Sequence, residues 1–117
     1  MSTQMYIVVM YGVDIGYDTY KKKETNDEPP DGVSDITHVP KKLDMTNINV
    51  LVDTVSGDYA IVGYPLIYSK DVYDGGDVDM IELKEFTPEE KENLKKFILD
   101  KFGVNKDPKY IVLSHYT

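Results

Sequence analysis

The sequence contains no cysteine, no tryptophan and no arginine, and all 13 of its basic residues are lysines. The missing cysteine excludes disulfides and thiolate chemistry and is compatible with an intracellular protein. The missing arginine, on a chain of net charge −8, argues against direct nucleic-acid binding. Arginine is the residue that usually makes bidentate hydrogen bonds to phosphates and to the edges of guanine bases. It also argues against an arginine-clamped phosphoryl-transfer site. An AT-rich coding sequence, which favours lysine over arginine, is the alternative explanation.

The sequence also lacks a long apolar run. No stretch approaches the roughly 18 apolar residues of a membrane span, and the N-terminus has neither the basic segment nor the small-residue cleavage site of a signal peptide. We therefore expect a soluble, cytoplasmic protein with no membrane partner. A length of 117 residues with 41% hydrophobic content predicts one folded domain over 1–117 with a core of its own.

Several short segments have the patterns of β-strands. Residues 5–13 are apolar throughout and rich in β-branched and aromatic side chains, which predicts a central strand covered on both faces. Residues 46–53 alternate between apolar and polar, and a Ser-Gly-Asp turn leads from them into a strand at 59–68. Pro65 in that strand predicts an edge, a bulge or a break. Further strands are expected at 35–39, 78–83 and 110–115.

One helix is marked by its ends and by its apolar stripe. Thr87, Pro88 and Glu90 form a capping box with proline at the first helical position, and Gly103 suits the other end. The apolar stripe consists of Leu94, Phe97, Ile98 and Phe102. The predicted fold class is α+β: a mostly antiparallel sheet of about five strands, with one helix at about 87–102 packed on one face. The last strand is expected beside the first, parallel to it through a right-handed crossover.

Two segments carry most of the negative charge. Residues 14–35 hold seven acids and three lysines, with Pro29 and Pro30, and no strand or helix period persists, which predicts a long exposed acidic loop. Residues 71–82 hold five acids and no lysine. If the fold brings both segments to one side, they form a focused negative surface that steers a basic partner. A dispersed, solubilising surface is the alternative.

Tyrosines lie among these acids and supply candidate contact residues. The chain has 10 tyrosines, and tyrosine is a frequent interface anchor because it is large, rather rigid and amphipathic. The alternative is that they fill strand positions, which tyrosine also favours. The predicted partner-binding residues are Asp71, Tyr73, Asp74, Asp77, Asp79, Tyr17 and Asp18.

No catalytic or nucleotide-binding motif is present, so we predict no catalytic residue, no cofactor and no metal. The 71–82 segment matches a calcium loop poorly, because Tyr73 and Gly75 stand where carboxylates are needed. A metal-stabilised module there remains an alternative. His38 and His115 lack a surrounding motif, although a pocket near Asp14, Asp18 and His38 is a second hypothesis, for a small enzyme or ligand-binding domain.

The favoured hypothesis is a small acidic, non-enzymatic protein that binds a basic surface on a protein partner through acidic Tyr/Asp loops. A nucleic-acid-acting enzyme is one such target, which the protein would inhibit or modulate. In size, acidity and lack of motifs, the chain resembles the small accessory proteins of phages and mobile elements, a resemblance of general style. The 59–68 strand, as an unpaired edge, offers a homodimer contact as a further alternative.

Overall fold

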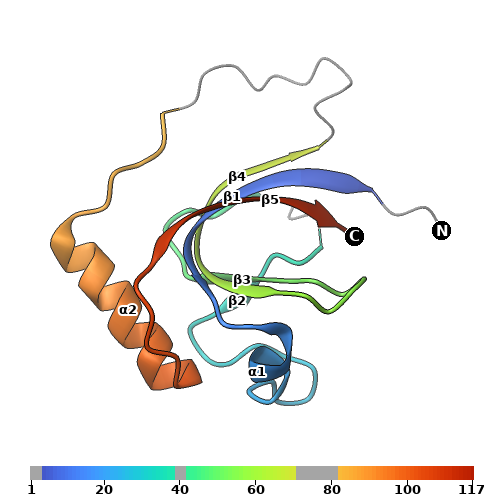
Figure 1. The fold of residues 1–117 in the computed structure, drawn as a ribbon, viewed down its shortest axis with the longest axis horizontal. Helices are drawn as coiled ribbons and strands as arrows, with labels where there is room; N and C mark the ends of the chain where they lie inside the picture. The colour runs from blue at the N-terminus through green and yellow to red at the C-terminus, as the bar shows by residue number, and fades with distance from the viewer. Residues whose placement is uncertain (1–3, 39–41, 71–81) are drawn as a thin grey trace.

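A computed structural model describes residues 4–38, 42–70 and 82–117 and shows an α+β fold (Figure 1). A five-stranded sheet has the order β2-β3-β4-β1-β5. In chain order the elements are β1 (Met5–Asp14), α1 (Tyr17–Lys21), β2 (Ser34–Asp35), β3 (Asn49–Val52), β4 (Ala60–Lys70), α2 (Pro88–Phe102) and β5 (Lys109–Tyr116). This confirms the predicted fold class.

The apolar first strand is central, as its composition predicts. β1 pairs with β4 on one side and with β5 on the other, both antiparallel. Val8 and Met10 are fully buried on one face of β1, and Tyr11 and Val13 are buried on the other. A strand with neighbours on both edges and apolar contacts on both faces has no position for a polar side chain, which explains its continuous apolar run.

The strand directions at the two edges of the sheet differ from the prediction. β5 lies beside β1, as expected, but antiparallel to it, so the predicted parallel pairing is wrong. Since β4 is also antiparallel to β1, α2 connects two strands that are parallel to each other with β1 inserted between them. The parallel neighbours in the sheet are instead β2 and β3.

The 59–68 strand is paired on both sides along only part of its length. β4 lies between β3 and β1: residues 61–63 pair on both sides, whereas beyond Gly63 β4 pairs with β1 alone among the described strands. Pro65 marks a bulge: Val9 pairs with Ile67 and Met10 with Pro65, which leaves Leu66 as the extra residue. Of the expected strand at 78–83, residues 78–81 lie outside the described residues, and Glu82 and Leu83 are not in a strand.

The sheet curves strongly, and a glycine pair permits the curvature (Figure 1). Gly12 of β1 pairs with Gly63 of β4. A Cβ added to Gly12 would lie 2.0 Å from the carbonyl oxygen of Val62, and one added to Gly63 would lie 2.1 Å from that of Tyr11. Only residues without a Cβ allow the two backbones to approach in this way, which is the usual reason for glycine at a sheet corner.

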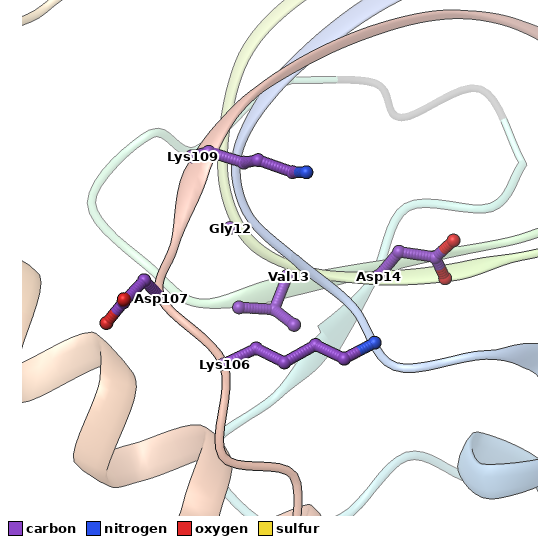
Figure 2. Close-up of a pocket in the computed structure, with 6 residues that line it drawn as sticks. All are labelled: Gly12, Val13, Asp14, Lys106, Asp107 and Lys109. Carbon is purple, nitrogen blue, oxygen red and sulfur yellow. The ribbon is translucent and has the colours of Figure 1, made fainter.

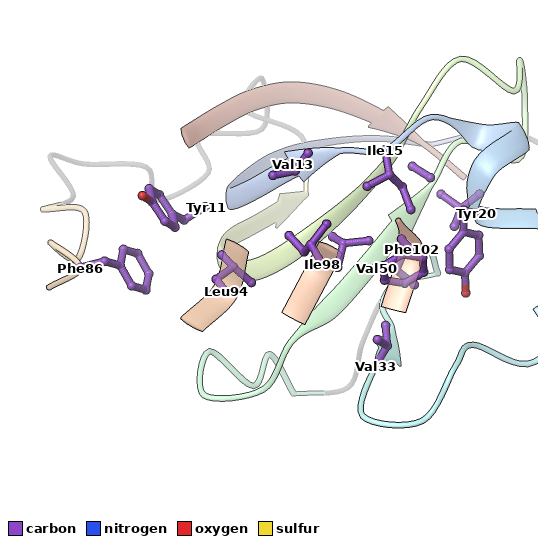
Figure 3. Close-up of a cluster of buried hydrophobic side chains, with 13 residues drawn as sticks. Tyr11, Val13, Ile15, Tyr20, Val33, Val50, Phe86, Leu94, Ile98 and Phe102 are labelled. Carbon is purple, nitrogen blue, oxygen red and sulfur yellow. The ribbon is translucent and has the colours of Figure 1, made fainter. Parts of the chain in front are cut away.

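The helix α2 covers one face of the sheet, and its ends follow the sequence signals. Thr87 Oγ1 accepts from the Glu90 N–H at 3.1 Å, and Glu90 Oε1 accepts from the Thr87 N–H at 3.0 Å. Gly103 ends the helix with a left-handed φ of 72°. The buried face of the helix packs on the sheet (Figure 3) through Leu94, Ile98 and Phe102. Neither helix of the described ranges has the length and apolar character needed to cross a membrane.

The opposite, concave face of the sheet has a second core. It is formed by Tyr6, Val8, Met10, Ile36, Leu51 and Ile61. Partly buried Tyr59, Tyr68, Ile111 and Leu113 pack against it. Two cores on the two faces of one curved sheet explain how a chain of 117 residues with a single long helix buries so many of its strand residues.

Candidate protein-binding surface

Residues 14–35 form an ordered, exposed structure rather than the structureless loop expected from their composition. They contain the helix α1 and an isolated bridge between Thr25 and Glu28. The helix was missed because five residues are too few for a helical period to be visible in the sequence. It is held by Tyr20, which is 1% exposed and packs against Phe102 with ring centroids 6.1 Å apart.

Tyr17 and Asp18, two predicted contact residues, lie on α1. Asp18 is exposed and Tyr17 is half-buried. The Tyr17 ring lies close to the turn before β4, since a Cβ on Gly57 would be 3.7 Å from it. Lys21 Nζ lies 5.5 Å from the centre of the same ring. The Tyr17 ring therefore has neighbours on two sides.

Asp14 connects α1 to the sheet. Its Oδ1 accepts hydrogen bonds from the Gly16 N–H at 3.0 Å and from the Ala60 N–H at 3.2 Å. The first bond sets the direction of the chain at the start of α1, where Gly16 has a φ of 86°. The second holds this corner of the structure against β4. Asp14 is thus a structural residue whose exposed carboxylate also adds to the local negative charge.

The turn between β3 and β4 adds Asp58, which the sequence did not indicate as a site residue. Asp53 holds this turn in shape. The Asp53 carboxylate accepts from the N–H groups of Val55, Ser56 and Asp58, at 3.0–3.1 Å. Burial raises the pKa of Asp53, but these three bonds outweigh it and hold the pKa below its usual value. The turn leaves Val55 and Asp58 exposed, and Gly57, which precedes Asp58, lies close to the Tyr17 ring. The sequence alone does not indicate that the turn containing Asp58 meets Tyr17, because the two are far apart along the chain.

Residues 14–35 and this turn are together named the acidic surface below. Its exposed acids are Asp14, Asp18, Asp27, Glu28, Asp31, Asp35 and Asp58, and its exposed lysines are Lys21, Lys22 and Lys23. Glu24 is less exposed and pairs with Lys21 at 2.9 Å. Within the described ranges none of the seven exposed acids forms an ion pair with a lysine. Their charges therefore remain available to a partner.

The other predicted contact residues cannot be placed on this surface. Asp71, Tyr73, Asp74, Asp77 and Asp79 lie outside the described residues, as does most of the 71–82 segment considered as a metal site. Among residues 4–38, 42–70 and 82–117, no three histidine or acidic side chains converge as metal ligands would.

The pocket expected near Asp14, Asp18 and His38 is present only at Asp14. His38 Nδ1 lies 2.9 Å from Thr117 Oγ1, beyond the end of β5 that pairs with the start of β1, whereas Asp14 ends β1. Asp14 lines a cavity of about 460 Å³ whose other described lining residues are Gly12, Val13, Lys106, Asp107 and Lys109 (Figure 2). The Asp107 carboxylate is turned away from this cavity and pairs with Lys95 at 2.8 Å.

His115 is a core histidine rather than a surface one. It is fully buried, its Nε2 lies 2.7 Å from the Thr37 carbonyl oxygen, and its Nδ1 lies 2.6 Å from the Tyr59 hydroxyl. Because a carbonyl only accepts, Nε2 carries the proton and Nδ1 accepts from Tyr59. Burial lowers the pKa of His115 and raises that of Tyr59. Both ring nitrogens are satisfied within the protein, which indicates a structural role.

Comparison of the chain with protein-family models, with curated proteins and with solved structures yields no match.

Proposed function

We propose that the protein is a non-enzymatic binding protein that uses its acidic surface to occupy a basic surface on another protein. The observation that carries the proposal is the set of exposed acids without an ion pair in the described ranges, on segments that include Tyr17, whose ring lies against the turn before β4. Complementary charge steers association and selects the partner, and a half-buried tyrosine supplies contact area at low entropic cost. The scaffold beneath is two packed cores, which makes the surface rigid.

A nucleic-acid-acting protein is the partner class that this chemistry fits. Such proteins carry basic surfaces shaped for phosphates, and an acidic protein that covers such a surface inhibits or modulates nucleic-acid binding. The setting we propose is the cytoplasm, as an accessory protein of a phage or mobile element. Asp71, Tyr73, Asp74, Asp77 and Asp79 belong to the proposal as further contacts.

The proposal is tested by matched charge variants. Partners are captured from a native lysate, and their affinity is then measured with the wild type and with Asp18→Asn/Glu28→Gln/Asp31→Asn, which removes three exposed charges from the acidic surface. The control is Glu89→Gln/Glu92→Gln/Asp100→Asn, which removes three exposed charges from α2 and the same net charge from the chain.

We expect the acidic-surface variant to weaken binding by about 0.2–1 kcal/mol per removed charge if the contacts lie at the interface rim, while the α2 variant retains wild-type affinity. Raising the salt from about 50 mM to about 500 mM should weaken the wild-type complex, because the Debye length shrinks. Equal losses in the two variants, or an affinity independent of salt, would reject the proposal.

The ligand-binding alternative keeps one observation in its favour, the cavity beside Asp14 (Figure 2). Lys106 and Lys109 line it, and neither forms an ion pair within the described ranges. A small anionic ligand would bind through these two lysines, in a cavity that Asp14 also lines. Binding of small carboxylates or phosphates by the wild type, lost in Lys106→Met/Lys109→Met, would support this function over the first.

A further inference from the structure

β5 is an edge strand whose outer hydrogen-bonding groups can be assigned to particular residues. It is last in the sheet order and pairs only with β1 among the described strands. Beyond its end, Gln4 and Thr117 exchange both backbone bonds, at 2.9 and 3.1 Å. The β1–β5 register runs without a shift, and in an antiparallel pair the direction of these groups alternates with every residue. The residues whose backbone N–H and C=O groups point outward are therefore Tyr110, Val112, Ser114 and Tyr116.

The same four residues, together with Lys109 at the first position, are the exposed residues of the strand. Val112 is 69% exposed, Tyr116 46% and Tyr110 40%. The alternate residues, Ile111, Leu113 and His115, face the concave core. Within the part of the chain that the structure describes, β5 thus presents an unpaired ladder of four residues together with the exposed side chains of Tyr110, Val112 and Tyr116. Native proteins commonly blunt such an edge with charges, proline or a bulge, and an edge without them pairs readily with another strand.

We infer that β5 pairs with β5 of a second copy of this chain, antiparallel and centred on Leu113. In this register Tyr110 lies opposite Tyr116 of the second copy and Val112 opposite its Ser114, so all four outward residues form ladder bonds. A two-fold axis at Leu113 makes the contact isologous and closed. The facing tyrosines are a favourable cross-strand pair. The contact is separate from the acidic surface and does not depend on the proposed function.

Charge favours a second copy as the occupant. Although the chain carries a net charge of −8, β5 has one charged residue, Lys109, at its first position. In the antiparallel register the two copies of Lys109 are at opposite ends of the contact, roughly 27 Å apart at about 3.4 Å per residue. This exceeds the Debye length of about 8 Å at physiological salt, so no like charges oppose each other across the strands. A basic peptide gains nothing here, because β5 has no acid.

Sedimentation equilibrium of the full chain tests this inference. The weight-average mass should rise from 13.4 kDa toward twice that value as the concentration increases. Higher salt should leave this association unchanged or strengthen it, because the two copies are both acidic. Salt acts in the opposite direction on the complex with a basic partner, so the two proposals fail independently. A mass of 13.4 kDa at every concentration would overturn the dimer.

Val112→Lys places a charge in the contact, with Leu99→Lys as its matched control. In the proposed register the two introduced lysine side chains are diagonal neighbours about 7 Å apart, and we expect the dimer dissociation constant to rise about tenfold or more. Leu99 is 43% exposed on α2, so the control adds the same charge elsewhere. Both positions are exposed, and equal melting temperatures of the two variants will show that each folds. Equal effects of the two variants on dimerisation would overturn the β5 contact.

A disulfide tests the register. Since the chain has no cysteine, Leu113→Cys introduces a unique thiol at the two-fold axis, where facing residues in an antiparallel pair are close enough to bridge. Oxidation should yield a covalent dimer of Leu113→Cys. Leu99→Cys should remain largely monomeric under the same conditions. Equal cross-linking of the two variants would overturn the pairing centred on Leu113.

Discussion

Lowering the pH should destabilise the protein through His115, which the fold holds neutral. The ring is fully buried and bonded at both nitrogens. Burial lowers the pKa of His115. The Thr37 carbonyl and Asp53 raise this pKa, and His38 lowers it further. The unfolded chain therefore takes up a proton near pH 6.5, the ordinary histidine value, which the folded chain does not take up until the pH is lower.

The sign and the limit of the effect follow from proton linkage. The stabilisation is fully present above pH 6.5 and is lost as the pH falls from there toward the pKa of His115 in the folded protein. Below that pKa, His115 causes no further loss of stability. One proton contributes at most about 1.4 kcal/mol per pH unit. Between pH 6.5 and about pH 5 the loss from His115 is therefore at most about 2 kcal/mol, or roughly 8 °C in melting temperature for a chain of this length.

Urea unfolding between about pH 7.5 and about pH 5 measures this loss. His115→Phe keeps a ring beside Tyr59 and Tyr68 and should be less stable at every pH, by about 1–3 kcal/mol, because Tyr59 and Thr37 lose a bonding partner. It should also lack the histidine part of the pH dependence. His38→Asn, at an exposed position, should keep the wild-type dependence. If His115→Phe loses as much stability as the wild type from pH 6.5 to about pH 5, this reasoning is wrong.

Two further predictions concern stability measured by urea unfolding at neutral pH. Tyr20→Phe should leave the free energy of unfolding unchanged or raise it by up to about 1 kcal/mol, because the buried Tyr20 hydroxyl has no hydrogen-bond partner among the described residues; a clear loss would show that this hydroxyl is bonded in solution. Gly12→Ala should lower the free energy of unfolding by roughly 3 kcal/mol or more, because the added Cβ would lie 2.0 Å from a backbone oxygen of β4. Gly103→Ala, where only a left-handed φ of 72° is disfavoured, should cost about 1 kcal/mol; equal losses in the two glycine variants would contradict the close approach at Gly12.

The parts of the fold that local pattern determines were predictable from the sequence. The α2 boundaries follow from Thr87, Pro88 and Gly103, whose roles depend on the backbone within one turn. The central position of β1 follows from its unbroken apolar run, and Pro65 indicated an edge, a bulge or a break, of which the structure has the bulge. These signals are short in range, so a single sequence contains all that is needed to interpret them.

The parts that depend on distant contacts were not predictable. The direction of β5 depends on α2 crossing over β1, which no residue of β5 records. The helix α1 is held in place because Tyr20 packs against Phe102, far along the chain. On the acidic surface, Tyr17 and Asp18 could be proposed from the sequence, whereas Asp58 could not, because its neighbourhood arises only when the turn before β4 meets α1.

The order of strands in the sheet has a consequence for folding kinetics. Both neighbours of β1 are distant from it in the sequence, since β4 begins at Ala60 and β5 at Lys109. During synthesis β1 therefore emerges before both of its partners and has no hydrogen-bonding partner in the sheet until β4 has been made. Contacts of such long sequence separation slow folding relative to that of folds built from local contacts. The window in which β1 is open to aggregation or to chaperones is thus set by the position of its partners in the sequence.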